Sequence, residues 1–251
     1  MNPSPILKAL SSIRRSGART LLMGGQACVF YGAAEFSRDL DLLILAGAGN
    51  LARVSSALEV LAARPIAVPP FEARHLLRGH AVHFRCGRED VAGLRVDIMT
   101  TLRGVADFEE LWMRRTTLEV EGEPVDLLAI EDLVLAKKTQ RDKDWPMIRR
   151  LIEQSYFRRP SEPSAAAVDF WLRELRSPEL LVEAAGSYHS RARALADRRP
   201  ALAAALRGDV EHVGELLDAE EREERRKDRE YWAPLKKELE QLRLARRNPS
   251  P

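Results

Sequence analysis

Residues 21–45 have the sequence LLMGGQACVFYGAAEFSRDLDLLIL. The apolar ends predict two strands, the glycines at 24 and 25 predict a tight turn after the first, and residues 26–31 predict a short helix. Asp39 and Asp41 stand two residues apart in the second strand. Their side chains therefore share one face, because side chains alternate along a strand, and the leucines that follow them point into a core.

Two neighbouring carboxylates beside an apolar strand cost free energy unless a cation neutralises them. Mg²⁺ or Mn²⁺ meets this need, because hard divalent cations prefer carboxylate and phosphate oxygens. The glycine pair lets backbone approach a ligand closely, and the free amides that start a helix favour an anion. The stretch thus predicts a site for a metal-bound triphosphate. The competing interpretation is a plain turn followed by solvated acids at a strand edge.

The order of Gly24-Gly25, a helix and then Ser37-Arg38-Asp39-Leu40-Asp41 resembles the signature of the DNA polymerase beta-like nucleotidyltransferase superfamily. Within it, the chain is most similar to bacterial minimal and abortive-infection (AbiEii-type) enzymes. The resemblance implies an α+β nucleotidyltransferase fold, with a mixed sheet flanked by helices. It also implies magnesium and the transfer of a nucleoside monophosphate from a nucleoside triphosphate. Gly24, Gly25 and Ser37 would then bind the nucleotide, and Asp39 and Asp41 the metal.

A third acid occurs in a second pair of predicted strands. Residues 80–86 (HAVHFRC) and 94–101 (LRVDIMTT) alternate as strands do and read as a hairpin, with Asp97 amid apolar residues. If the sheet is ordered as in the resembled fold, Asp97 lies beside the first two acids. There it would bind metal and take the proton of the attacking hydroxyl. The alternative is a carboxylate paired with Arg95 or Arg103.

Residues 130–141 (IEDLVLAKKTQR) predict a helix whose buried stripe reaches Lys137 and then Arg141. A lysine on an inward face should meet an anion, because burying an unpaired ammonium is costly. The resemblance implies that both cations approach the triphosphate. The alternative is that Lys137 reaches solvent or pairs with a surface acid. Lys138 faces elsewhere and serves as a control.

The remaining pattern divides the chain into a nucleotidyltransferase domain, residues 1–157, and a helical C-terminal domain, residues 158–251. Asn50 and Asp144 are expected to cap the helices that follow them. A second hairpin is expected from residues 117–120 and 125–128. The other expected helices span residues 5–15, 51–63, 107–115, 145–156, 165–175, 178–185, 190–196 and 200–206.

The C-terminal stretch after Asp209 is strongly charged, and Pro234 is expected to split it into two helical pieces. Leu235, Leu239 and Leu242 form an apolar stripe on the second piece. This stripe packs on the parent domain, or on a protein partner or a second copy of the chain. A further alternative is that Arg243, Arg246 and Arg247 bind nucleic acid.

The composition gives no global case for nucleic acid or a membrane, because 40 Lys and Arg residues oppose 38 acids and the net charge is +2. Cys28 and Cys86 show neither a disulfide framework nor a zinc pattern. The five histidines have no convincing ligand spacing and are interpreted as ordinary. Without a long apolar run, the protein is expected in the cytoplasm.

Two functions follow from these patterns. The first is an enzyme that transfers a nucleoside monophosphate to a hydroxyl of a transfer RNA end, a protein or a small molecule such as an aminoglycoside. The second is a non-catalytic module that binds a nucleotide or a partner. Relatives of both kinds occur in toxin and antitoxin systems. The intact acids favour chemistry, whereas Glu35 and Met147 depart from the family's pattern.

Overall fold

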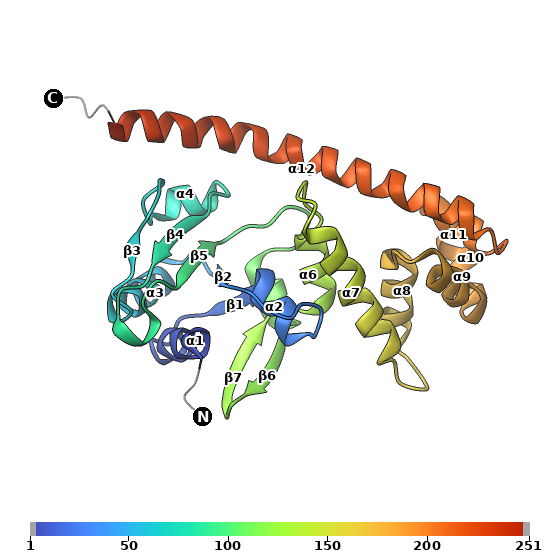
Figure 1. The fold of residues 1–251 in the computed structure, drawn as a ribbon, viewed down its shortest axis with the longest axis horizontal. Coiled ribbons are helices and arrows are strands. Elements are labelled where there is room, and N and C mark those ends of the chain that lie inside the picture. Colours follow the sequence, from blue (N-terminus) through green and yellow to red (C-terminus); the bar gives the residue numbers. More distant parts are fainter. Residues whose placement is uncertain (1–3, 248–251) are drawn as a thin grey trace. The chain divides into compact units, whose positions relative to one another are not determined.

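The computed structural model describes residues 4–247, which form two compact units (Figure 1). The first unit contains the described residues up to Phe30, then Ala34–Ala136 and the residues from Tyr231 onward. The second contains Tyr31–Ala33 and Lys137–Glu230. The expected domain boundary between residues 157 and 158 stays a prediction.

A mixed, seven-stranded sheet forms the centre of the first unit, in the order β3-β4-β5-β2-β1-β7-β6. The pairs β2–β5 and β1–β7 are parallel, and the other neighbours are antiparallel. The α+β class with a mixed sheet is therefore confirmed. The strands are β1 Thr20–Met23, β2 Asp39–Ile44, β3 Arg64–Pro65, β4 Val82–Arg85, β5 Arg95–Met99, β6 Thr116–Val120 and β7 Glu123–Leu127.

Helices flank this sheet (Figure 1). They are α1 Pro5–Arg15, α2 Gly24–Phe30, α3 Ala48–Val60, α4 Ala73–Leu77, the 3-10 helix η1 Glu89–Val91, α5 Phe108–Met113 and α6 Ile130–Ala136. Helix α1 begins where expected, because the Ser4 hydroxyl accepts a hydrogen bond from the Leu7 amide. It packs against α3 and η1, while α2 packs against β1 and β2.

Alternation along β2 and β5 separates a core face from a polar face. The side chains of the core face, Leu40, Leu42, Val96 and Ile98, are all fully buried. The residues between them are only partly buried. The hydrophobic burial of one face thus fixes which side chains the other face presents, because a slip of one residue would exchange the two faces.

The second unit is helical. Its helices are α7 Asp144–Phe157, α8 Ala165–Glu174, α9 Pro178–Ser187, α10 His189–Ala196, α11 Pro200–Ala205 and the first part of α12 Val210–Arg247. Tyr156 and Trp171 form an edge-to-face pair in its core, with ring centroids 5.4 Å apart. The helices expected after residue 164 are therefore present.

Asn50 does not cap a helix, which corrects the expectation from the sequence. Helix α3 begins at Ala48, so Asn50 lies within its first turn. The Asn50 side chain accepts a hydrogen bond from the Arg19 amide at 2.7 Å and donates to the carbonyl oxygens of Arg19 and Leu45. The side chain thus joins the residue before β1 to the residue after β2. The local sequence pattern does not reveal the partner before β1, because it lies 31 residues away.

Pro234 does not split the last helix, which is a second correction. Helix α12 is continuous over its 38 residues with Pro234 inside it. A proline removes one helical hydrogen bond, but the buried Leu235 and the hydrogen bonds of Glu238 with Arg78 and His80 fix the turn that follows it. Leu235 is buried and packs close to Gly79 in the first unit, so the apolar stripe does contact the parent domain at this residue. None of the helices within residues 4–247 combines the length and the apolar character needed to cross a membrane.

Candidate functional site

Three carboxylates lie on the polar face of β2 and β5. The parallel register places Asp41 directly opposite Asp97, and Asp39 opposite Arg95. Residues that are opposite in register share a face, so Asp39, Asp41 and Asp97 lie on the same side of the sheet. We call these three residues the acid face. The structure places Asp97 beside the other two acids as expected, while the role of each acid stays a prediction.

Gly24 and Gly25 are the first two residues of α2 and follow β1 directly, so they are part of the helix rather than a separate turn before it. Gly24 has a φ of +68°, and a Cβ there would lie 1.9 Å from the Asp41 Oδ2 and 2.6 Å from the Asp41 Cβ. A Cβ on Gly25 would lie 2.6 Å from the Ser37 Oγ. We call this pair the glycine corner. Only glycine permits such close approach, so the corner brings Asp41 and Ser37 against the start of α2.

Asp97 already has two partners. Arg95 Nε donates a hydrogen bond to Asp97 Oδ1 at 2.8 Å, and His83 Nδ1 lies 2.9 Å from the same oxygen. Burial raises the pKa of Asp97, but the hydrogen bonds from His83 and Arg95 outweigh burial, so the pKa lies below its ordinary value. The alternative pairing with Arg95 is therefore present.

His83 belongs to the polar face, although the sequence analysis interpreted it as ordinary. The antiparallel register of β4 and β5 sets His83 directly opposite Asp97. The histidine is partly exposed, with 27% of its side-chain area accessible, so it borders the acid face rather than the core. The available signal was the alternation in residues 80–86 combined with the hairpin length. Together these would have placed the two residues on one face.

The acid face matches Mg²⁺ in the chemical type of its ligands. Asp39 and Asp41 offer carboxylate oxygens on one face of the sheet, with Asp41 against the glycine corner, and carboxylate is the ligand type that magnesium prefers. Within residues 4–247, however, no group of three or more His, Cys, Asp or Glu side chains is arranged to hold a metal ion. Asp39 and Asp41 match a divalent cation in ligand type, and Asp97 is bonded to Arg95 and contacts His83.

Lys137 lies in the second unit and not on the predicted helix, because α6 ends at Ala136. Its side chain is buried, and Nζ donates a hydrogen bond to Asp144 Oδ1 at 3.2 Å. Thr139 Oγ1 and Arg141 Nε donate to the other Asp144 oxygen at 2.6 and 2.7 Å. The expected anion is thus a buried carboxylate of the same chain. Because these three donors surround Asp144, the segment turns back on it and the helix stops early.

Asp144 does not cap α7, which corrects the sequence analysis. It is the first residue of α7, and its side-chain oxygens are taken by the three donors of the preceding turn. Burial raises the pKa of Asp144, but the positive charges of Lys137 and Arg141 and the hydrogen bonds from Thr139 and Lys137 together outweigh burial, so the pKa falls below its ordinary value. Lys138 bonds Glu174 instead, which confirms that it faces away from Lys137.

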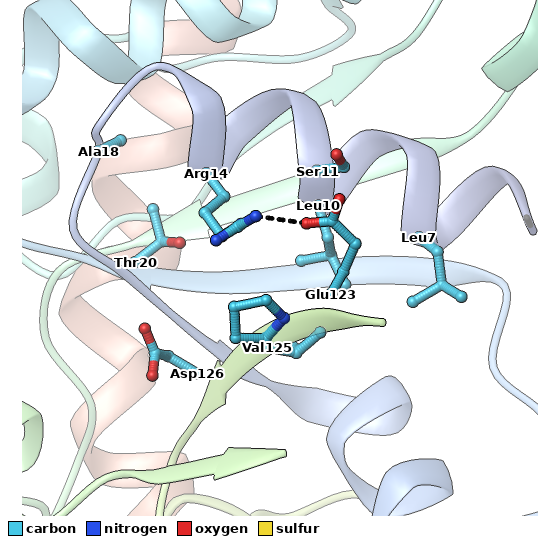
Figure 2. Close-up of a pocket in the computed structure, with 10 residues that line it drawn as sticks. Leu7, Leu10, Ser11, Arg14, Ala18, Thr20, Glu123, Val125 and Asp126 are labelled. Atoms are coloured by element: carbon cyan, nitrogen blue, oxygen red, sulfur yellow. Dashed lines mark hydrogen bonds and ion pairs between the residues drawn. The ribbon is translucent and has the colours of Figure 1, made fainter. Parts of the chain in front are cut away.

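Two cavities lie away from the acid face, between α1 and the β6–β7 hairpin. They measure about 50 and 240 Å³ and share Leu7, Ser11 and Glu123 in their walls. Figure 2 shows the smaller one, where an ion pair joins Arg14 to Glu123 at 2.5 Å. Its wall includes Thr20 at the start of β1, whereas Gly24 follows the end of β1. The smaller cavity therefore lies at the other end of β1 from the glycine corner.

Comparison with known proteins gives structural neighbours only. No family model matches the chain, and no curated protein matches it by sequence. The chain is similar to an antigenic nucleotidyltransferase-like protein from Paracoccidioides brasiliensis, with a TM-score of 0.40 and 19% identity over 80% of this chain and 90% of that one. It is also similar to a putative nucleotidyltransferase from H. pylori, with a TM-score of 0.39 and 17% identity over 90% and 94% of the two chains.

Proposed function

We propose that the protein is a metal-dependent nucleotidyltransferase. It would move a nucleoside monophosphate from a nucleoside triphosphate, bound with Mg²⁺ or Mn²⁺, to a hydroxyl of an RNA, protein or small-molecule acceptor. One observation carries this proposal. Asp41 touches the glycine corner and is also the register partner of Asp97, so backbone that can approach phosphate adjoins three carboxylates.

Asp39 and Asp41 would hold the ion, because both lie on the polar face and Asp41 touches the glycine corner. A bound divalent cation supplies charge stabilisation to the phosphoryl oxygens. Gly24 and Gly25 leave room for phosphate oxygens near the backbone. The Ser37 hydroxyl, which now makes a long hydrogen bond of 3.4 Å to the Asp39 carbonyl oxygen, can turn to donate to a phosphate instead.

The third acid would orient the acceptor. With its pKa below the ordinary value, Asp97 is ionised at neutral pH and can accept a hydrogen bond from the attacking hydroxyl. The acceptor oxygen forms a bond to the α-phosphorus while the bond from that phosphorus to the pyrophosphate oxygen breaks. The hydroxyl proton passes to Asp97 and then to solvent. Pyrophosphate leaves.

Lys137 and Arg141 are the proposed cations for the departing pyrophosphate, as the family resemblance implies. Both are bonded to Asp144, which orients them in the segment before α7. A charge that is shared with a carboxylate is weaker toward a phosphate, so we rank these two residues below the acid face. Membership of a toxin–antitoxin system and a cytoplasmic location are parts of the same proposal.

The test uses nucleoside triphosphates labelled at the α-phosphate, with Mg²⁺ and either total RNA or total protein as acceptor. The Asp39→Ala, Asp41→Ala double variant should lose label transfer. A Glu59→Ala, Glu119→Ala double variant is the control, because it removes the same charge from exposed positions of the same unit. Transfer that is undiminished in the aspartate variant would overturn the proposal.

A second candidate is a non-catalytic module that binds a nucleotide or a partner. It is favoured by the internal pairing of charges, since Asp97 is held by Arg95 and Lys137 by Asp144. Such a module would bind nucleoside triphosphate, as measured by isothermal titration calorimetry, without transferring label to any acceptor. Release of pyrophosphate that depends on Asp39 and Asp41 would exclude it.

A further inference from the structure

The charge of Arg95 acts on every member of the acid face. It is the register partner of Asp39, and its Nε donates to Asp97 at 2.8 Å. The hydrogen bond with Asp97 comes first among the causes that raise the pKa of Arg95, and the charges of Asp39 and Asp41 add to it. The guanidinium therefore already supplies positive charge to these carboxylates.

The neighbouring carboxylates of the acid face need a cation to neutralise their charge. The structure shows that the chain meets part of that need itself, because an arginine cannot lose its proton in a protein. A divalent cation that recruits Asp97 must break the Arg95–Asp97 bond, and one that binds Asp39 and Asp41 must tolerate a nearby like charge. Arg95 therefore opposes the ion by competition and by repulsion.

The Arg95 guanidinium can move into solvent when it separates from Asp97. The Arg95 side chain is 38% exposed, whereas that of Asp97 is 14% exposed. Arginine has a long stem, so its head can swing into solvent while the strand and the carboxylate stay in place. Asp97 would keep its second contact, to His83, during the exchange.

We propose that Arg95 is the resident counter-cation of the acid face, and that it sets the affinity for the divalent ion by exchanging with it. This inference rests on the proposed function and adds a residue to it that the sequence analysis considered only as a structural partner. In the metal-free protein Arg95 neutralises Asp97. With a divalent ion bound, Arg95 and Asp97 would separate, and Asp97 would become available to the ion.

The test measures the binding of Mn²⁺ alone, without nucleotide, by the electron paramagnetic resonance signal of the free ion at one fixed pH. Arg95→Met keeps much of the side-chain length and removes the charge, so it should bind Mn²⁺ about tenfold more tightly than the unchanged protein, as expected for the loss of a partly exposed charge-assisted hydrogen bond. Arg95→Lys should remain near the unchanged protein because it keeps a positive charge.

Arg85→Met is the matched control. Arg85 is exposed and lies directly opposite Arg95 in the register of β4 and β5. Its replacement by methionine therefore removes the same charge from the same face of the sheet. It should change Mn²⁺ affinity less than threefold, because a screened, exposed charge acts weakly. Far-UV circular dichroism and thermal unfolding verify that each variant is folded.

The outcomes separate this inference from the proposed function. If Arg95→Met binds no tighter than the unchanged protein, or if Arg85→Met tightens binding equally, the role of Arg95 is overturned. The proposed function survives that result when the Asp39→Ala, Asp41→Ala variant still loses Mn²⁺ binding. If the aspartate variant binds Mn²⁺ like the unchanged protein, or if no variant binds at all, both proposals fail.

Discussion

Replacing Gly24 by alanine tests whether the glycine corner is built on contact with Asp41. Two costs add at this position. An alanine at a φ of +68° costs about 1–2 kcal/mol, because its Cβ crowds the carbonyl oxygen in the left-handed region. The same Cβ would lie 2.6 Å from the Asp41 Cβ, so the strand or the helix must move, which costs about 1–3 kcal/mol as overpacking does.

The sum is a loss of about 2–5 kcal/mol in the stability of the first unit. Gly93→Ala separates the two costs. Gly93 has a φ of +81° and no heavy atom within 4 Å of an added Cβ, so it should lose only the conformational share, about 1–2 kcal/mol.

Hydrogen exchange followed by mass spectrometry measures the free energy of opening for peptides that cover β1 and β2. This readout reports on the first unit even if the two units unfold separately. Gly24→Ala should lower that free energy by about 1–3 kcal/mol more than Gly93→Ala does. Equal losses in the two variants would refute the claim that Gly24 and Asp41 are in tight contact.

Three further substitutions test other contacts. Asp144→Asn leaves the buried Lys137 without its anion, so thermal unfolding should show a loss of about 3–5 kcal/mol, and a loss below about 1 kcal/mol would argue against the buried pair. Asn50→Ala removes three hydrogen bonds and should reduce stability in urea by about 2–4 kcal/mol, whereas a simple helix cap would account for only about 1 kcal/mol. Hydrogen bonds from Arg78, and next from His80, lower the pKa of Glu238 to about 2 from 4.5, so its contribution to stability is complete above pH 4.5 and is lost as the pH falls toward 2. The stability difference between the unchanged protein and Glu238→Gln should shrink across that window, and a difference that stays constant would contradict this linkage.

Much of the sheet could be predicted from the sequence because the signals are local. Period-two alternation identified β2 and β5 and gave each acid its face, and burial of the intervening leucines, valine and isoleucine enforces that assignment. The neighbouring position of Asp97 needed more than alternation. It depended on the strand order of the resembled fold, which the structure reproduces at this point.

The partners of the charged residues could not be predicted in the same way. The apolar periodicity predicted a helix that continues through Lys137 to Arg141. In the structure the helix ends at Ala136, and Asp144 accepts hydrogen bonds from both of these residues. Asn50 has the right residue type for a cap, yet its partners come from a distant segment. In each case a tertiary hydrogen bond overrides a local preference, and a one-dimensional pattern does not contain it.

The family motif contains the acids and not the residues that contact them. Arg95 and His83 occupy the same face as Asp97, but neither belongs to the motif that identified the site. Their contacts with Asp97 decide how available its carboxylate is. A carboxylate in a familiar position is therefore evidence for a site, and the groups bonded to it determine what it can do.

The central claim is that Asp39 and Asp41 bind a divalent cation beside a nucleotide. The most direct measurement is anomalous diffraction from crystals grown with Mn²⁺ and a non-hydrolysable nucleoside triphosphate. We predict a manganese peak at about 2.0–2.2 Å from carboxylate oxygens of both aspartates, with a phosphate oxygen as a further ligand. Bound nucleotide with no manganese at these two carboxylates, or manganese only at other acids, would contradict the claim.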